Sequence, residues 1–119
     1  MATRRAVRLR LLDILDAIRG IEETLGGLDF ARYQSVWHLR RATERGIEII
    51  SEASRHIPQD LKQKYPAVPW NEIAGIGNVL RHDYQHVADE IVWNVTRRHL
   101  KTLRHAIEAL LPLVPDNDR

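Results

Sequence analysis

The sequence predicts an all-α fold, an antiparallel four-helix bundle, and three observations lead to it. Apolar residues recur at steps of three and four along four segments, which is the period of an amphipathic helix. No segment has the pattern of a strand. The connections between the segments are short, which favours antiparallel neighbours. With 119 residues, 44% of them hydrophobic, the chain suits one domain over residues 1–119.

The first two helices are predicted from an apolar stripe and from the residues that end or start a helix. The stripe of the first helix consists of Leu11, Ile14, Leu15, Ile18, Ile21 and Leu25. Gly26 and Gly27 end it, because paired glycines favour a left-handed cap and weaken a helix interior. Asp29 is the expected N-cap of the second helix. That helix continues to Pro58 and carries the small residues Gly46 and Ala53 on its apolar seam, which indicates close contact with another helix.

The second half of the chain contains the main loop and two further helices. Residues 58–69 hold three prolines and fit neither the helix period nor the strand period, which is typical of a loop. Pro69 suits a helix start, and a short third helix is predicted from there to a turn at residues 82–84. A fourth helix is predicted from about His86 to Leu113, followed by a frayed tail from about residue 114.

Composition limits the class of protein. The chain has no cysteine, which excludes disulfides and thiolate metal sites. Charged residues interrupt the apolar positions near the N-terminus, so neither a signal segment nor a membrane span is predicted, and we expect a cytoplasmic protein. The net charge of +2 is only a weak indication of nucleic-acid binding, because such binding depends on clustered positive charge rather than on the total. The arginines do cluster at residues 4–10, 40–45 and 97–104, although solvated helix faces are the favoured explanation for each cluster.

Chemically versatile side chains are densest in the hexapeptide Arg81-His82-Asp83-Tyr84-Gln85-His86. Metal-free RNA cleavage needs a base, an acid and a cation for the charge that builds on phosphorus. Histidine suits proton transfer near neutrality and arginine has a fork that matches phosphate oxygens. Arg81, His82 and His86 therefore form a minimal set, with Asn78 one turn earlier. Two alternatives remain: a metal site at His82, Asp83 and His86, or residues that only cap and pack.

Three stretches carry a resemblance to a known family. They are Trp70-Asn71-Glu72-Ile73-Ala74-Gly75-Ile76-Gly77-Asn78-Val79-Leu80-Arg81-His82-Asp83-Tyr84, the second-helix residues 41–53 and Asp89-Glu90-Ile91-Val92-Trp93. Together with length and helix order, they resemble the HepT-like ribonuclease toxins of the HEPN superfamily. The family motif is an arginine, usually followed by asparagine, three more residues and His-x-Tyr.

The motif matches this sequence with one departure. Asn78, His82 and Tyr84 take the asparagine, histidine and tyrosine positions, while Gly77 stands at the arginine position. Arg81, one turn further along, can replace the missing guanidinium, and we favour this interpretation because the flanking sequence fixes the register on His82. The alternative pairs Arg81 with His86, one turn out of register, but then no tyrosine follows.

The resemblance implies a function and partners. It implies a homodimer in which two motif helices build one RNA cleft. The sequence itself offers two candidate dimer faces, the seam with Gly46 and Ala53 and the short third helix. It implies a metal-independent endoribonuclease without cofactors, the toxin of a type VII-like toxin–antitoxin system. An MNT-type nucleotidyltransferase antitoxin would silence it by transferring AMP to Tyr84.

The resemblance also assigns roles to single residues and leaves other functions open. His82 would handle the proton, Arg81 would stabilise the phosphate charge, and Asn78 would orient the histidine or the RNA, with Asp83 and His86 as secondary candidates. A HEPN interaction module that binds a nucleotidyltransferase or a nucleotide without cutting RNA is the alternative, supported by Gly77. A generic helical structural protein is the third hypothesis.

Overall fold

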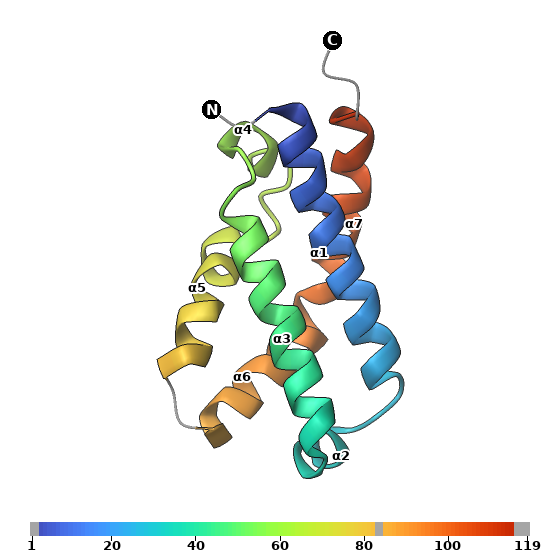
Figure 1. Cartoon of the computed structure of the whole chain (residues 1–119), viewed down its shortest axis with the longest axis vertical. Helices are drawn as coiled ribbons and strands as arrows, with labels where there is room; N and C mark the ends of the chain where they lie inside the picture. The colour runs from blue at the N-terminus through green and yellow to red at the C-terminus, as the bar shows by residue number, and fades with distance from the viewer. Residues whose placement is uncertain (1–2, 83–84, 116–119) are drawn as a thin grey trace.

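All secondary structure in the described part of the chain is helical (Figure 1). The computed structural model describes residues 3–82 and 85–115, without the side chains of residues 82 and 85–88. The helices are α1 (Arg4–Leu25), α2 (Phe30–Ser35), α3 (Trp37–Ser54), α4 (Gln59–Lys62), α5 (Trp70–His82), α6 (Gln85–Arg98) and α7 (Leu100–Leu110), followed by the 3-10 helix η1 (Leu111–Leu113). The predicted all-α class is confirmed, and the packing of the helices is that of a bundle.

The long helices α1 and α3 form the centre of the bundle, with α5 on one side and α7 on the other (Figure 1). The stripe predicted for the first helix is the face of α1 that the core buries, and its residues are at most 5% exposed. Thr3 caps α1 by accepting a hydrogen bond from the N–H of Ala6 at 3.0 Å. At the same end of the bundle, Arg8 donates to the carbonyl oxygens of Leu111 and Val114, which ties η1 to α1.

The second predicted helix is divided into α2 and α3. Asp29 caps α2 as expected and accepts from the N–H of Arg32 at 2.9 Å. The break comes at Val36, whose backbone is extended at φ −113° and ψ 111°. The break allows α2 to bury Tyr33 completely, in contact with the rings of Phe30 and Trp93. The stabilisation from burying the Tyr33 ring therefore exceeds the cost of interrupting the helix at Val36.

The fourth predicted helix is also divided, at His99, where φ is −119°. In Figure 1, α6 crosses the bundle obliquely and α7 then runs along α1. The change of direction lets α6 bury Val92 and lets α7 bury Leu103, Ile107 and Leu110. None of the helices in the described ranges has the length and apolar character needed to cross a membrane.

The close helix contact predicted at Gly46 and Ala53 is inside the molecule. Both residues are buried, and a Cβ atom on Gly46 would lie 2.8 Å from the side chain of Ile21 in α1. This seam therefore holds α3 against α1 and is not available as a dimer face. Of the two candidate faces, only the one on α5, the short third helix of the prediction, remains.

Candidate active site

Two polar side chains at the C-terminal end of α3, Ser51 and the C-cap residue Arg55, fix α5, the helix that carries most of the motif. The hydroxyl of Ser51 donates to the carbonyl of Ala74 at 2.9 Å and accepts from the N–H of Gly77 at 3.2 Å. The guanidinium of Arg55 donates to the same carbonyl through Nε at 3.0 Å and Nη2 at 2.8 Å. Hydrogen bonds from a charged donor are stronger than neutral ones. The backbone of α5 is therefore held in place at Ala74 and Gly77, before the helix ends at His82.

Gly77, at the position of the family arginine, lies in direct contact with Ser51 of α3. It is buried, and a Cβ atom there would be 3.0 Å from Oγ and 3.4 Å from Cβ of Ser51. The same Cβ would be 3.6 Å from Nη1 of Arg81. The guanidinium of Arg81 therefore reaches back one turn and lies against the place where a side chain of residue 77 would begin.

The structure describes only part of the predicted site. Asn78 and Arg81 are both exposed on α5, three positions apart, which makes them neighbours on one helix surface. His82 is the last residue of α5, and its side chain lies outside the described residues, as does that of His86 in α6. Asp83 and Tyr84 lie wholly outside them. The roles assigned to these residues stay predictions.

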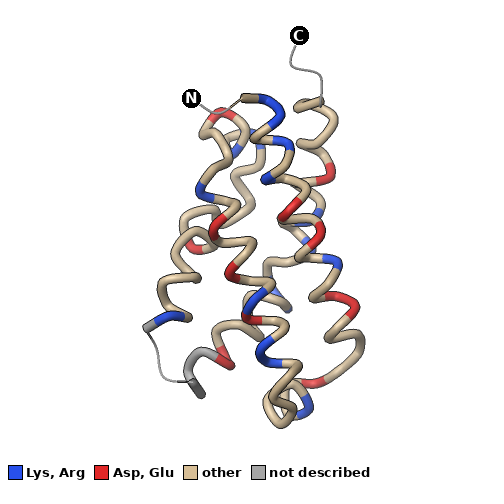
Figure 2. Tube along the Cα trace, in the orientation of Figure 1, with Lys and Arg blue, Asp and Glu red and all other residues tan. Residues whose placement is uncertain are grey.

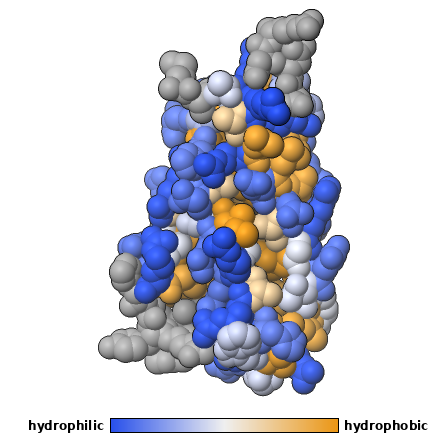
Figure 3. Space-filling view, in the orientation of Figure 1, coloured by the Kyte–Doolittle hydropathy of each residue, from blue (hydrophilic) through white to orange (hydrophobic). Residues whose placement is uncertain are grey.

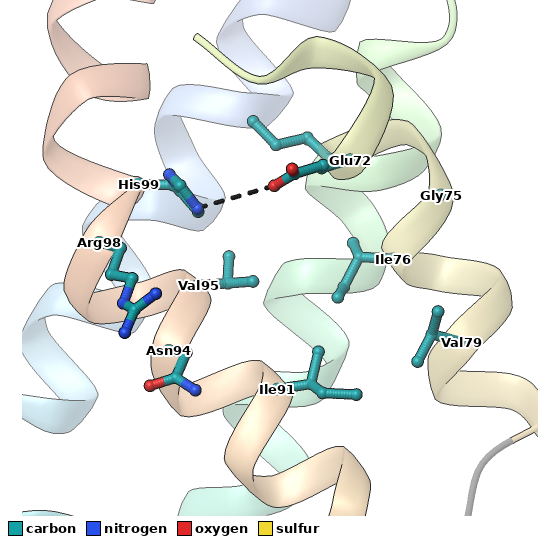
Figure 4. Close-up of a pocket in the computed structure, with 10 residues that line it drawn as sticks. Glu72, Gly75, Ile76, Val79, Ile91, Asn94, Val95, Arg98 and His99 are labelled. Atoms are coloured by element: carbon teal, nitrogen blue, oxygen red, sulfur yellow. Dashed lines mark ion pairs between the residues drawn. The ribbon is translucent and has the colours of Figure 1, made fainter.

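A groove lies between α5 and α6, next to the helix end that carries the motif (Figure 4). Its volume is about 460 Å³, within the range of small-ligand sites. Its floor is apolar and consists of Ile73, Ile76, Val79, Ile91 and Val95. Glu72, Asn94, Arg98 and His99 supply polar groups around it, and Nε2 of His99 is 3.9 Å from a carboxylate oxygen of Glu72. Sequence reasoning counted Arg98 in the basic cluster at residues 97–104 and gave Asn94 and His99 no functional role.

A largely buried polar cluster joins α6 to α3. Nε of Arg40 lies 3.9 Å from Oδ1 of Asp89, and both side chains are largely buried. Tyr33 and Glu44 lie in the same cluster. Burial raises the pKa of Tyr33, and the Asp89 and Glu44 carboxylates raise it further, against the opposing effect of Arg40. Burial also raises the pKa of Glu44, partly offset by Arg41. The cluster fixes α6 against α3 at Asp89.

A metal site was the alternative interpretation of the hexapeptide. Among the residues that the structure describes, no three His, Asp or Glu side chains are grouped closely enough to hold a metal ion. The side chains of His82, Asp83 and His86 are not part of that set. The motif side chains that the structure does place are the exposed guanidinium of Arg81 and the exposed amide of Asn78, which can donate hydrogen bonds to a phosphate.

The fold and this site define a class: an all-helical domain that presents an amide and a guanidinium at a helix end beside an apolar groove. Comparison with known families makes the class specific. The family model "Ribonuclease HepT-like" matches residues 14–110, and the chain belongs to this family.

Curated relatives agree over most of their length. The chain is 31% identical to "Putative RNase MJ1380" of Methanocaldococcus jannaschii, over 89% of this chain and 97% of that protein. It is 34% identical to "Probable ribonuclease HepT" of Thermococcus cleftensis, over 84% and 91%. It is 32% identical to "Putative RNase TTE0752" of Caldanaerobacter subterraneus, over 82% and 88%. No solved structure matches the chain at a significant level.

Proposed function

We propose that this protein is a metal-independent endoribonuclease whose catalytic groups are His82 and Arg81, with Asn78 as an orienting residue. The observation that carries the proposal is the exposed Arg81 guanidinium, which reaches back over Gly77 beside Asn78. Family membership and the names of the relatives support it. A shift of the arginine by one turn keeps a guanidinium on the same helix surface.

The chemistry follows from these groups. His82 takes the proton of a ribose 2′-hydroxyl, and the 2′-oxygen attacks the adjacent phosphorus. Arg81 binds the phosphate oxygens, on which negative charge builds. The bond from phosphorus to the 5′-oxygen of the next nucleotide breaks, and a second imidazole gives that oxygen a proton. A partner copy in a homodimer would supply this second imidazole.

The direct test is cleavage of RNA in the presence of a chelator. Purified wild-type protein should cleave, and His82→Ala should reduce the rate by about 10²-fold or more, the usual contribution of a positioned acid–base group. His105→Ala is the matched control, because His105 is exposed on α7. Cleavage that survives His82→Ala would remove His82 from the mechanism, and cleavage that requires an added divalent ion would contradict metal independence.

We further propose that the protein is the toxin of a type VII-like toxin–antitoxin pair, silenced when an MNT-type nucleotidyltransferase transfers AMP from ATP to Tyr84. The support is the motif tyrosine, two residues after His82. Each added AMP brings a negative phosphate and bulk to a surface meant for RNA phosphates, so no refolding is needed. Intact-mass measurement after incubation with an MNT-type nucleotidyltransferase and ATP should show added AMP, with release of pyrophosphate, on wild type and none on Tyr84→Phe.

A second candidate function is a HEPN interaction module that does not cut RNA, and Gly77 favours it. Gly77→Arg separates the two candidates. If Arg81 already serves as the catalytic cation, the substitution brings no gain in cleavage. A large gain would favour the interaction module as the role of the natural protein. Because a side chain at residue 77 meets Ser51, the comparison should include Ser51→Ala with and without Gly77→Arg.

A further inference from the structure

The most exposed of the large hydrophobic side chains that the structure describes is an aromatic ring, Trp37, the first residue of α3. It is 63% exposed, whereas Trp70 is 8% exposed and Trp93 packs on Phe30 and Tyr33. The guanidinium of Arg41, one turn along α3, lies over the Trp37 ring at 5.7 Å from its centroid. An indole and a guanidinium thus lie next to each other on the surface, exposed to solvent.

Arg45 continues this surface by one more turn of α3. Its side chain is 72% exposed and that of Arg41 is 42% exposed. Trp37, Arg41 and Arg45 are spaced by four residues and so lie on one side of the helix; we call them the α3 stripe. Glu44 and Glu48 pair with the two arginines at 2.9 and 3.8 Å. The Arg45–Glu48 pair is exposed and worth little, so a phosphate can replace Glu48. Glu44 is only 14% exposed and stays paired with Nη1 of Arg41, so Arg41 would contact a phosphate through its other N–H groups. Figure 3 shows that hydrophilic side chains dominate this face along α3.

The α3 stripe begins level with the end of α5. The two helices run in opposite directions (Figure 1), and Ser51 contacts Gly77. An α-helix rises about 1.5 Å per residue, so the end of α5 lies about 7.5 Å beyond this contact and Arg45 about 9 Å beyond it in the same direction. Trp37 lies about 12 Å further. The Arg40–Asp89 pair confirms that this end of α3 lies beside the start of α6.

We propose that the α3 stripe binds an unpaired RNA strand next to the cleaved phosphate. One base stacks on the Trp37–Arg41 pair, and the phosphates that lead toward the end of α5 contact Arg41 and Arg45. The proposal rests on the proposed ribonuclease function and adds a substrate class to it. Aromatic rings and arginine planes bind bases of any sequence by stacking, which requires unstacked bases and so excludes a regular duplex.

The test separates binding from cleavage by using a fluorescein-labelled 2′-O-methyl oligouridylate, which lacks the attacking hydroxyl. Trp37→Ala should weaken its binding, measured by fluorescence anisotropy at fixed salt, by about tenfold, the size expected for one stacked base. Trp37→Phe should restore most of the affinity. Arg45→Gln should weaken binding and reduce its salt dependence. The matched control is Leu113→Ala, since Leu113 is 54% exposed in η1, at the other end of the bundle.

Each outcome decides between this inference, the proposed function and a protein contact. Unchanged affinity in Trp37→Ala, or equal affinity of wild type for a duplex of 2′-O-methyl RNA, would overturn the inference while leaving cleavage untouched. If Trp37→Ala changes the sedimentation coefficient but not RNA affinity, the α3 stripe covers a second copy, and the inference is wrong. Trp37-dependent binding by a protein that never cleaves unmodified RNA would support the α3 stripe and contradict the ribonuclease proposal.

Discussion

Gly77 and Ser51 are adapted to each other at the level of single atoms. The hydroxyl of Ser51 is held between the carbonyl of Ala74 and the N–H of Gly77, so it cannot turn away from residue 77 without losing these contacts. A side chain at residue 77 would meet this hydroxyl at 3.0 Å. The glycine at the family's arginine position therefore makes room for the Ser51 hydroxyl, and the Arg81 side chain lies beside it.

A double-mutant cycle tests this adaptation. Gly77→Ala should destabilise the protein more when Ser51 is present than in a Ser51→Ala background, because removing the hydroxyl removes the closest contact of the new methyl group. The coupling should be about 1 kcal/mol, in the range for residues in direct contact. Urea unfolding followed by circular dichroism measures it. Gly75→Ala is the matched control, since a Cβ there meets nothing within 4 Å, and additive effects at residues 51 and 77 would contradict the adaptation.

The role of Arg81 can also be tested by comparing its planar guanidinium with the compact ammonium of lysine. Arg81→Ala should lower the single-turnover rate of RNA cleavage by about 10²-fold or more, as expected when a group that stabilises transition-state charge is lost. Arg81→Lys keeps the charge but loses the planar fork, so it should recover only part of the rate. Arg19→Ala is the control, because Arg19 is an exposed arginine on α1. A wild-type rate in Arg81→Ala would show that the shifted arginine does not replace the one missing at residue 77.

At the scale of helices, local patterns predicted which residues face the core but not where helices break. The stripe from Leu11 to Leu25 and the cap at Asp29 depend on local spacing, and both are confirmed. The breaks at Val36 and His99 have no strong local signal, because neither residue is a glycine or a proline. The break at Val36 depends on the packing of Tyr33 against Trp93, residues 60 positions apart in the chain. The break at His99 depends on the burial of Leu103, Ile107 and Leu110 once α7 has changed direction.

The same distinction applies to the candidate site. The motif register places Asn78 and Arg81 three positions apart on one helix, and both are exposed in the structure. The groups that fix this helix, Ser51 and Arg55, come from α3 and carry no motif of their own. The groove also combines residues of α5 and α6, so its outline depends on how two helices cross. Such contacts cannot be predicted from a periodic pattern alone.

The attachment of α2 to the bundle predicts an unusual dependence of stability on pH. Tyr33 is fully buried, and its hydroxyl has no hydrogen-bond partner within the described ranges. Folding raises its pKa above the ordinary value of 10.0, mainly through burial. The unfolded chain therefore loses the phenol proton first, and the free energy of unfolding should fall as the pH rises above about 10.

Tyr33→Phe should remove this part of the pH dependence. At neutral pH it should leave stability unchanged or raise it by about 1 kcal/mol, because the substitution removes a buried polar group without a cavity. Urea unfolding between pH 7 and pH 11 measures both effects. Tyr65→Phe is the control, since Tyr65 is only partly buried. Equal loss of stability at high pH in wild type and Tyr33→Phe would contradict the assignment.

At the scale of the whole molecule, the candidate site lies in one half of the bundle and the two described chain ends lie in the other. α1 begins and α7 ends at the upper end in Figure 1, while α5 ends and α3 begins in the lower half. Basic and acidic positions alternate along the bundle, and Figure 2 shows blue segments in the lower half of α3. The apolar groove between α5 and α6 lies in this half too, which makes it the face that we expect a second copy to cover.

Dimer formation through this face gives the last prediction. Ile91 is only partly buried, on the groove side of α6, so Ile91→Glu should leave the fold intact while placing a charge where apolar side chains of two copies would meet. If two copies build one RNA cleft, this variant should be a monomer in sedimentation equilibrium and should lose cleavage together with dimerisation. Leu12→Glu, on the exposed side of α1, is the matched control and should remain dimeric and active. A monomer that cleaves RNA at the wild-type rate would mean that one chain holds the complete site, and His82 would then need its second imidazole from its own chain, where His86 is the nearest candidate in sequence.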